Sequence, residues 1–180
     1  MKKIVIIGPE STGKSTLCAQ LAQHYQTDWV REYAREYLLT HGTDYRVEDL
    51  WTIACGQRKA EDELLEKLRL EKGSDPVCII DTDFSVLKVW SEYVFNRCDN
   101  RILTEICNRN YDLYLLCNTD LPWVKDELRE YPDLETREKL FHYYKDYLVN
   151  QTLPWHIVSG TQGARLNSAT NFIDEVLFSH

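Results

Sequence analysis

An eight-residue segment near the N-terminus constrains the fold of this chain more than any other feature. Residues 8–15 read Gly-Pro-Glu-Ser-Thr-Gly-Lys-Ser and match the pattern G-x-x-x-x-G-K-[ST]. The apolar run Ile4–Ile7 precedes the segment and the amphipathic stretch Lys14–His24 follows it. A strand, a glycine-rich turn and a helix in this order predict a phosphate-binding loop, whose backbone N–H groups point at phosphate oxygens. The alternative, a turn that only opens a helix, explains the motif less well.

Each residue type in this loop has an expected task at a nucleoside triphosphate. Gly8 and Gly13 permit backbone conformations that a side chain would block. Lys14 is expected to reach the β- and γ-phosphates, and Ser15 is expected to ligate Mg²⁺. The sequence therefore predicts ATP and Mg²⁺ as cofactors, although it leaves GTP open as the donor. The expected phosphate contacts are Gly8, Glu10, Ser11, Thr12, Gly13, Lys14, Ser15 and Thr16.

Short apolar runs alternate with longer amphipathic stretches along the chain, which is typical of an α/β fold with a parallel sheet. The expected strands are Lys3–Ile7, Asp28–Arg31, Val77–Asp81, Leu113–Cys117 and His156–Ser159. The expected helices are Lys14–His24, Val47–Lys72, Phe84–Phe95, Arg101–Asn110, Leu134–Asn150 and Asn167–Phe178. Right-handed crossovers predict three layers in one domain over residues 1–180. The polar stretch at about 118–137 is expected to form a short lid.

Charge and cysteine content exclude several classes of protein. The chain carries 21 Lys and Arg against 29 Asp and Glu, a net charge of −8, which disfavours general nucleic-acid binding. The six cysteines show no C-x-x-C spacing and no signal peptide is recognisable, so we expect reduced thiols in the cytoplasm. No apolar run approaches the ~20 residues of a membrane span. The sequence leaves the oligomeric state open.

Two carboxylates lie at the end of the expected strand Val77–Asp81. Asp81 and Asp83 flank Thr82 at the carboxyl end of that strand, where α/β sheets bind ligands. Magnesium on a triphosphate needs a carboxylate for itself or its waters, and Asp81 is the assigned candidate. Asp83 is a candidate for orienting the acceptor hydroxyl. The alternative for Asp83 is capping of the helix that begins at Phe84.

A second polar cluster follows the expected strand Asp28–Arg31. Arg31 and Arg35 are four residues apart, as are Glu32 and Glu36, so each pair shares a helix face. A carboxylate here is suited to orient an acceptor hydroxyl or to accept its proton, as Glu32 would. The alternative is a solvated helix start with i,i+4 ion pairs. For a phosphorylated acceptor, the two arginines would instead bind its phosphate.

Three weaker signals complete the candidate site. Arg129, and Arg137 a little later, are placed to close over phosphates, and Trp123 in the same loop needs a surface to pack on. Trp90 and Tyr93 lie three residues apart on an expected helix, a stripe that is more often core than ligand-facing. The segment that contains Gly160, Thr161 and Arg165 follows the last expected strand. It is either the border of an adenine ring or a plain loop.

Taken together, these segments resemble the nicotinamide-riboside kinase domain of the NadR type. The resemblance runs from Ile4 to about Arg165 and is much more specific than the phosphate loop alone. The segments that carry it are GPESTGKSTL, WVREYAREYL, IACGQ at 53–57, DTD at 81–83, KVWSEYVF at 88–95 and LPWVKDELR at 121–129.

The resemblance implies a P-loop kinase fold with a parallel sheet in the order 2-3-1-4-5. It implies transfer of phosphate from ATP to the 5′-hydroxyl of nicotinamide riboside, which gives nicotinamide mononucleotide for NAD salvage. Arg129 would then belong to the lid, and Gly160–Arg165 would border the adenine. No adenylyltransferase or DNA-binding domain is expected, since neither precedes residue 1.

The expected reaction is in-line transfer of the γ-phosphoryl group to a bound nucleoside. Its catalytic residues would be Lys14, Arg129 and a carboxylate, either Glu32 or Asp83. The pyridinium cation of the acceptor would suit carboxylates and aromatic faces. The predicted acceptor contacts are Arg31, Glu32, Arg35, Asp83, Trp90, Tyr93 and Trp123. The alternatives are another nucleoside or nucleotide monophosphate kinase, or an ATP-binding regulatory module without catalysis.

Overall fold

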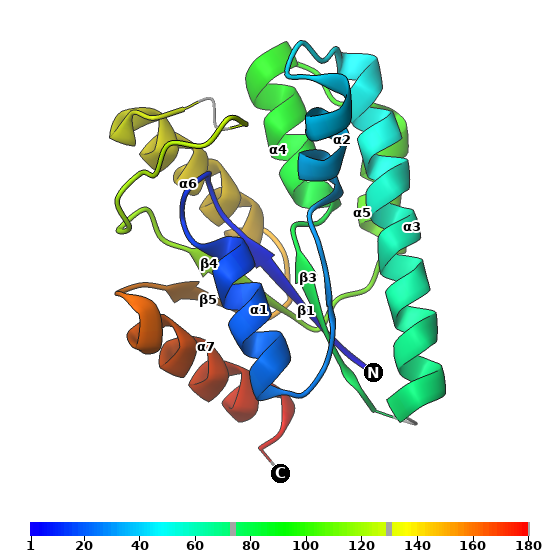
Figure 1. The fold of residues 1–180 in the computed structure, drawn as a ribbon, viewed down its shortest axis with the longest axis vertical. Coiled ribbons are helices and arrows are strands. Elements are labelled where there is room, and N and C mark those ends of the chain that lie inside the picture. Colours follow the sequence, from blue (N-terminus) through cyan, green and yellow to red (C-terminus); the bar gives the residue numbers. More distant parts are fainter. Residues whose placement is uncertain (73–74, 129–130, 180) are drawn as a thin grey trace.

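Five parallel strands form one sheet in the order β2-β3-β1-β4-β5 (Figure 1). The computed structural model describes residues 1–72, 75–128 and 131–179. The strands are β1 (Lys2–Ile7), β2 (Trp29–Val30), β3 (Val77–Asp81), β4 (Leu113–Cys117) and β5 (Trp155–Val158). The three-layer fold class and the strand order are confirmed. The outer strand β2 is shorter than expected, and β5 begins one residue before its expected start.

The helices match most of the expected spans. They are α1 (Lys14–His24), α2 (Tyr33–His41), α3 (Val47–Lys72), α4 (Phe84–Phe95), α5 (Asn100–Asn108), α6 (Leu134–Val149) and α7 (Gln162–Leu177). The expected start of the last helix at Asn167 is wrong, because the chain already turns at its N-cap, Thr161, where the Ala164 N–H donates to the Thr161 carbonyl at 2.9 Å. The expected lid contains no helix or strand in its described part before Leu134.

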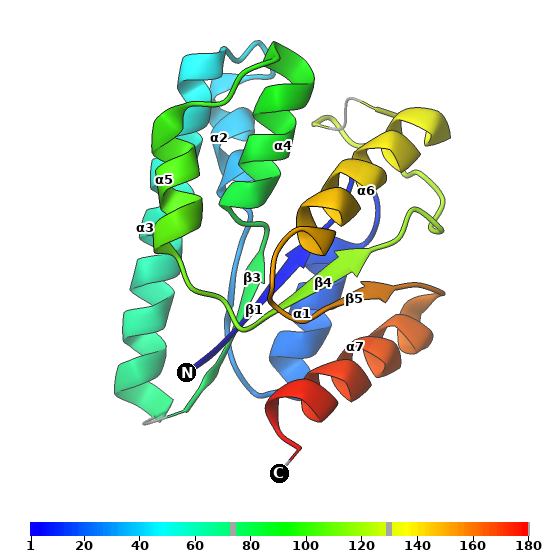
Figure 2. The same cartoon turned by 180° about the vertical axis from the view of Figure 1, so that it is seen from behind.

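The two faces of the sheet bury different residues of the same strand. In β1, Ile4 and Ile6 pack against α1 and α7, whereas Val5 and Ile7 pack toward α3, α4 and α6. This alternation follows from the period of two along a strand, and it shows why a wholly apolar run is needed at the centre of the sheet. Figure 2 shows α6 crossing the face opposite α1.

Helices α2 to α5 form a separate apolar cluster beside the strand ends. Tyr37, Leu50, Ile53 and Phe84 are buried in it. Gly56 on α3 lets α2 approach closely, since a Cβ there would lie 2.0 Å from Cε1 of Tyr33. The helices that carry this cluster lie beside the carboxyl ends of the strands (Figure 1).

Hydropathy of the described helices sets one further limit. Among residues 1–72, 75–128 and 131–179, none of the helices is long and apolar enough to cross a membrane.

Candidate functional site

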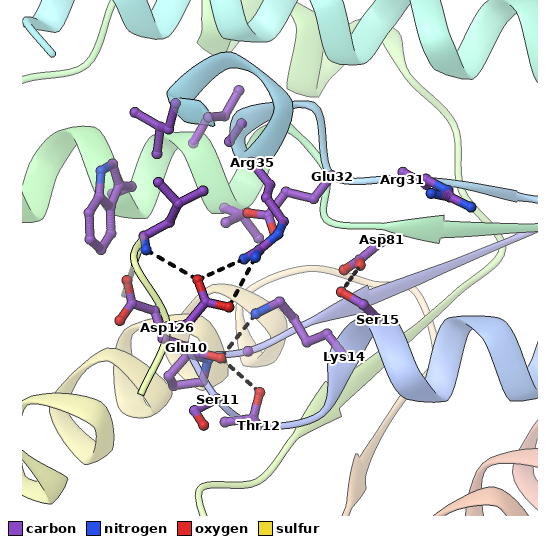
Figure 3. A pocket seen from close by; sticks show the side chains of 18 of the residues that line it. Glu10, Ser11, Thr12, Lys14, Ser15, Arg31, Glu32, Arg35, Asp81 and Asp126 are labelled. Atoms are coloured by element: carbon purple, nitrogen blue, oxygen red, sulfur yellow. Dashed lines mark hydrogen bonds and ion pairs between the residues drawn. The ribbon is translucent and has the colours of Figure 1, made fainter. Parts of the chain in front are cut away.

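A cavity of about 640 Å³ lies over the carboxyl ends of the strands, between the phosphate loop and α2 to α4. Figure 3 shows the side chains that converge on it. The predicted site residues that line it are Gly8, Glu10, Ser11, Thr12, Gly13, Lys14, Ser15, Thr16, Arg31, Glu32, Arg35, Asp81 and Trp90. Residues that are far apart in the sequence therefore meet at one place, the edge where parallel α/β sheets bind ligands.

The phosphate loop has the backbone that its glycines predict. Gly8 adopts φ +145°, and a Cβ there would lie 2.8 Å from the carbonyl oxygen of Cys117. Gly13 adopts φ +77° directly before α1, so the N-terminus of α1 faces the cavity. The Lys14 ammonium donates to the Pro9 carbonyl at 3.0 Å across the loop. A curled loop with a lysine across it is an anion-binding concavity.

Arg137 ties the phosphate loop to the predicted lid. Its guanidinium donates to the carbonyl oxygens of Glu10 at 3.2 Å, Ser11 at 3.3 Å and Leu121 at 3.2 Å. The side chain is buried, with 2% exposed. Arg137 thus joins the backbone of the phosphate loop to that of the predicted lid, a different task from the predicted contact with phosphates.

Ser15 and Asp81, which are predicted to hold Mg²⁺, are in direct contact. The Ser15 hydroxyl donates to Asp81 Oδ2 at 2.5 Å, while the buried Oδ1 has no hydrogen-bond partner among the residues that the structure describes. Burial and the nearby Glu32 raise the pKa of Asp81 to about 7, against the opposing effects of Lys14 and Ser15. A buried carboxylate with a spare oxygen gains from a cation. The hard oxygen ligands of this pair therefore fit Mg²⁺.

Glu32 stands at the start of α2, on the cavity wall opposite the phosphate loop (Figure 3). As the N-cap residue it makes no side-chain cap hydrogen bond. Gln57 fixes this position: its Oε1 accepts from the Tyr33 N–H at 2.8 Å, and its Nε2 donates to the Thr82 carbonyl at 3.2 Å. The buried amide of Gln57 therefore joins the start of α2 to the end of β3, next to Asp81.

Arg35 and Asp126 make a two-pronged ion pair across the mouth of the cavity (Figure 3). The two guanidinium nitrogens lie 3.1 and 2.9 Å from the two carboxylate oxygens. Hydrogen bonding to Asp126 raises the pKa of Arg35. The pair joins α2 to the predicted lid.

The far end of the cavity is apolar and aromatic. Trp90 on α4 donates its indole N–H to the Tyr45 hydroxyl at 2.6 Å, and both side chains line the space. Leu38, Leu50 and Leu87 complete this end. A planar ring can lie there with its polar edges toward the carboxylates.

The structure places Asp83 outside the cavity. Its Oδ1 accepts from the backbone N–H of Ser85 at 3.1 Å and also from the Ser85 hydroxyl, and its Oδ2 accepts from the Tyr114 hydroxyl at 2.7 Å. Burial raises its pKa. The capping interpretation is confirmed, and of the two predicted acceptor-side carboxylates the structure brings only Glu32 into the cavity.

Several other predicted residues also do not line the cavity. Tyr93 lines a second, separate groove between α4 and α6. Arg165 is 4% exposed, and its guanidinium donates to the carbonyl oxygens of Thr12 at 3.1 Å, Asn118 at 3.0 Å and Gly160 at 2.8 Å, so it braces three loops. The remaining predicted residues away from the cavity are Trp123, Gly160 and Thr161. Arg129 lies outside the described residues.

Sequence reasoning missed Asp126, Gln57 and Tyr45. The segments that contain Gln57 and Asp126 were already distinctive in the sequence, but their spacing along the chain gives no sign of their partners. Arg35 and Asp126 are 91 residues apart, and Trp90 and Tyr45 are 45 apart. Only the packed arrangement of α2, α3, α4 and the predicted lid brings these pairs together.

Comparisons with known sequences cover nearly the whole chain. A family model described as an AAA domain matches residues 3–165. The trifunctional NAD biosynthesis/regulator protein NadR of Salmonella typhimurium is 26% identical over 182 residues, which cover 98% of this chain and 43% of that protein. The protein of the same name from Escherichia coli is 32% identical over 133 residues, 72% of this chain and 31% of that protein. The chain thus spans less than half the length of these relatives.

Comparisons with solved structures support the same architecture. A NadR protein in complex with NR superposes with a TM-score of 0.81 at 22% identity, over 99% of this chain and 50% of that chain. A NadR protein in complex with NAD and AMP-PNP gives 0.75 at 20% identity, over 99% and 50%. A thymidylate kinase from Ehrlichia chaffeensis gives 0.69 at 14% identity, over 94% and 97%. At these identities the likeness establishes the fold.

Proposed function

This chain belongs to the AAA domain family, and on that premise we propose that it is an ATP-dependent kinase that phosphorylates the 5′-hydroxyl of nicotinamide riboside. The observation that carries the proposal is the convergence of three groups on one cavity: Lys14 in the phosphate loop, Asp81 with Ser15, and Glu32 opposite them. A donor end, a metal position and an acceptor carboxylate are the parts that phosphoryl transfer needs.

The choice of nicotinamide riboside rests on the relatives and on the chemistry of the acceptor end. The curated relatives are named for NAD biosynthesis, and a solved neighbour holds NR. The carboxylates of Glu32 and Glu36 and the ring of Trp90 line the same cavity. Carboxylates and aromatic faces both attract a pyridinium cation.

Each residue of the cavity has its own task in the proposed phosphoryl transfer. Lys14 and the N-terminus of α1 bind the triphosphate and stabilise the charge that spreads over the transferred group. Ser15 and Asp81 would hold Mg²⁺, which neutralises phosphate charge when it is bound. Glu32 orients the acceptor hydroxyl and takes its proton as the new P–O bond forms. The product is nicotinamide mononucleotide, and ADP leaves.

A substrate panel tests this proposal. Purified protein with ATP and Mg²⁺ is offered nicotinamide riboside, thymidine, deoxyadenosine and thymidine monophosphate, and ADP release is followed together with the mass of the product. We expect kcat/KM for nicotinamide riboside to exceed the others by about tenfold or more, a difference of ~1.4 kcal/mol. Preference for another acceptor would refute the assigned substrate, and ATP binding without turnover of any acceptor would favour a regulatory module.

Removing the Asp81 charge is expected to weaken the use of magnesium. In Asp81→Asn, the Mg²⁺ concentration that gives half-maximal activity should rise by about 10- to 100-fold at fixed ATP. The neutral asparagine amide has the size of the carboxylate but binds the cation or its waters less well. The matched control is Asp62→Asn on α3, whose carboxylate pairs with Arg109 away from the cavity. An unchanged magnesium requirement in Asp81→Asn would remove Asp81 from the metal site.

A further inference from the structure

We propose that Asp126 is a specificity-determining residue that makes this cavity select an unphosphorylated acceptor over its phosphate ester. By binding Arg35, Asp126 occupies the guanidinium that a phosphorylated acceptor would need. The inference rests on the proposed function, because it names the class of acceptor for the same site. It concerns the ion pair across the cavity mouth in Figure 3.

The geometry of the pair matches the geometry of the ligand that it would exclude. Arg35 presents two nitrogens to the two oxygens of Asp126 at 3.1 and 2.9 Å. This planar fork binds a phosphate in the same two-pronged way, so carboxylate and phosphate compete for one donor set. Asp126 is also held from its own side, since its Oδ1 accepts from the Leu128 N–H at 3.1 Å.

The other cations on the cavity wall have different positions and contacts. Lys14 lies across the phosphate loop with its ammonium on the Pro9 carbonyl. The Arg31 guanidinium lies over the Trp29 ring, 5.5 Å from its centre. Neither of these two cations forms a second pair of donors with Arg35 for a phosphate. Glu32 and Asp126 also line the cavity, and their negative charges repel a phosphate dianion.

The fold alone does not determine whether the acceptor is a nucleoside or its monophosphate. A thymidylate kinase, named for a nucleoside monophosphate acceptor, shares the architecture over 94% of this chain. A free arginine at the acceptor end would serve such an acceptor, and a neutralised arginine would not. Whether the Arg35 guanidinium is free or bound to Asp126 therefore decides between a monophosphate and a nucleoside acceptor in this cavity.

The decisive variant is Asp126→Asn, which keeps the shape of the side chain and removes its charge. Affinities are measured by calorimetry with saturating ADP in the donor site, for two matched pairs of probes. One pair is nicotinamide riboside and nicotinamide mononucleotide, and the other is thymidine and thymidine monophosphate. Within each pair only the phosphate differs, so the ratio of the two dissociation constants isolates its contribution.

We expect Asp126→Asn to tighten binding of the monophosphates by about tenfold, as an arginine becomes free for a charged hydrogen bond, with less than a threefold change for the nucleosides. The double variant Asp126→Asn/Arg35→Gln should return the ratio to its wild-type value. Asp62→Asn on α3, which removes the charge from the similar two-pronged pair with Arg109 at the end of α5, should leave the ratio unchanged.

An unchanged ratio in Asp126→Asn would overturn the inference. An equal loss of affinity for nucleosides and monophosphates would also overturn it, because that result describes a residue that only holds the lid. The two proposals fail separately. If the thymidine pair shows the gain while the wild-type protein does not phosphorylate nicotinamide riboside, the assigned substrate is wrong and the role of Asp126 stands.

Discussion

Replacing Lys14 by alanine is expected to lower kcat for phosphoryl transfer by about 10²- to 10³-fold, the loss that follows removal of one preorganised charge-stabilising donor. The ammonium crosses the phosphate loop to the Pro9 carbonyl at 3.0 Å and faces the cavity. In that position it would contact the phosphates whose charge grows during the proposed transfer, so its loss should affect kcat as well as ATP binding.

The variant keeps the fold, so that a loss of activity can be interpreted. Lys14 is the first residue of α1, and alanine is the best helix former. Circular dichroism and the thermal unfolding midpoint should therefore match those of the wild type. The control is Lys59→Ala on α3, an exposed lysine 3.8 Å from Glu63 whose loss should not change turnover. Full turnover in Lys14→Ala would contradict the assignment of the phosphate loop.

The central strands β3 and β4 could be predicted from the sequence because they are buried on both faces. The runs Val77–Ile80 and Leu113–Cys117 contain no charged residue, and the structure gives the two strands the expected bounds Val77–Asp81 and Leu113–Cys117. The edge strand β2 has only the two residues Trp29–Val30, one of them half-buried. A strand with one neighbour and little burial leaves a weak pattern, and its ends could not be predicted.

The roles of Asp81 and Asp83 show what local pattern leaves undecided. Two residues apart on a continuous strand, they would share one face of the sheet. Thr82, however, adopts φ +64°, which breaks the strand geometry between them. Asp81 then faces the cavity and Asp83 turns into the core against Tyr114. The sequence places both carboxylates at the strand end, but the choice between them depends on this one backbone angle.

The phosphate loop could be predicted from the sequence because its signal is local. Its residues are contiguous, and its chemistry depends on backbone conformations that the two glycines encode locally. The proposed acceptor end is assembled from α2, α3, α4 and the predicted lid, so its contacts join residues such as Arg35 and Asp126 across 91 positions. Pairing at that distance follows from packing, which no local pattern contains.

Replacing Glu32 by glutamine is the second change with a large expected effect. We expect kcat to fall by about 10²- to 10⁴-fold, the usual range for removal of a positioned acid or base. Glutamine has the same shape and keeps the cavity wall, but it cannot accept the proton of the acceptor hydroxyl. Gln57 and the N-terminus of α2 hold the position independently of the charge.

This test is specific because kcat is expected to fall while KM for ATP and the magnesium requirement are not expected to worsen. Glu32 raises the pKa of Asp81 through its negative charge, so its removal favours the ionised Asp81 that Mg²⁺ needs. The magnesium requirement and KM for ATP should therefore hold or improve while kcat falls. Glu63→Gln, at an exposed glutamate on α3, is the matched control and should retain wild-type kcat. A Glu32→Gln enzyme with wild-type kcat would show that the acceptor hydroxyl is activated by another group.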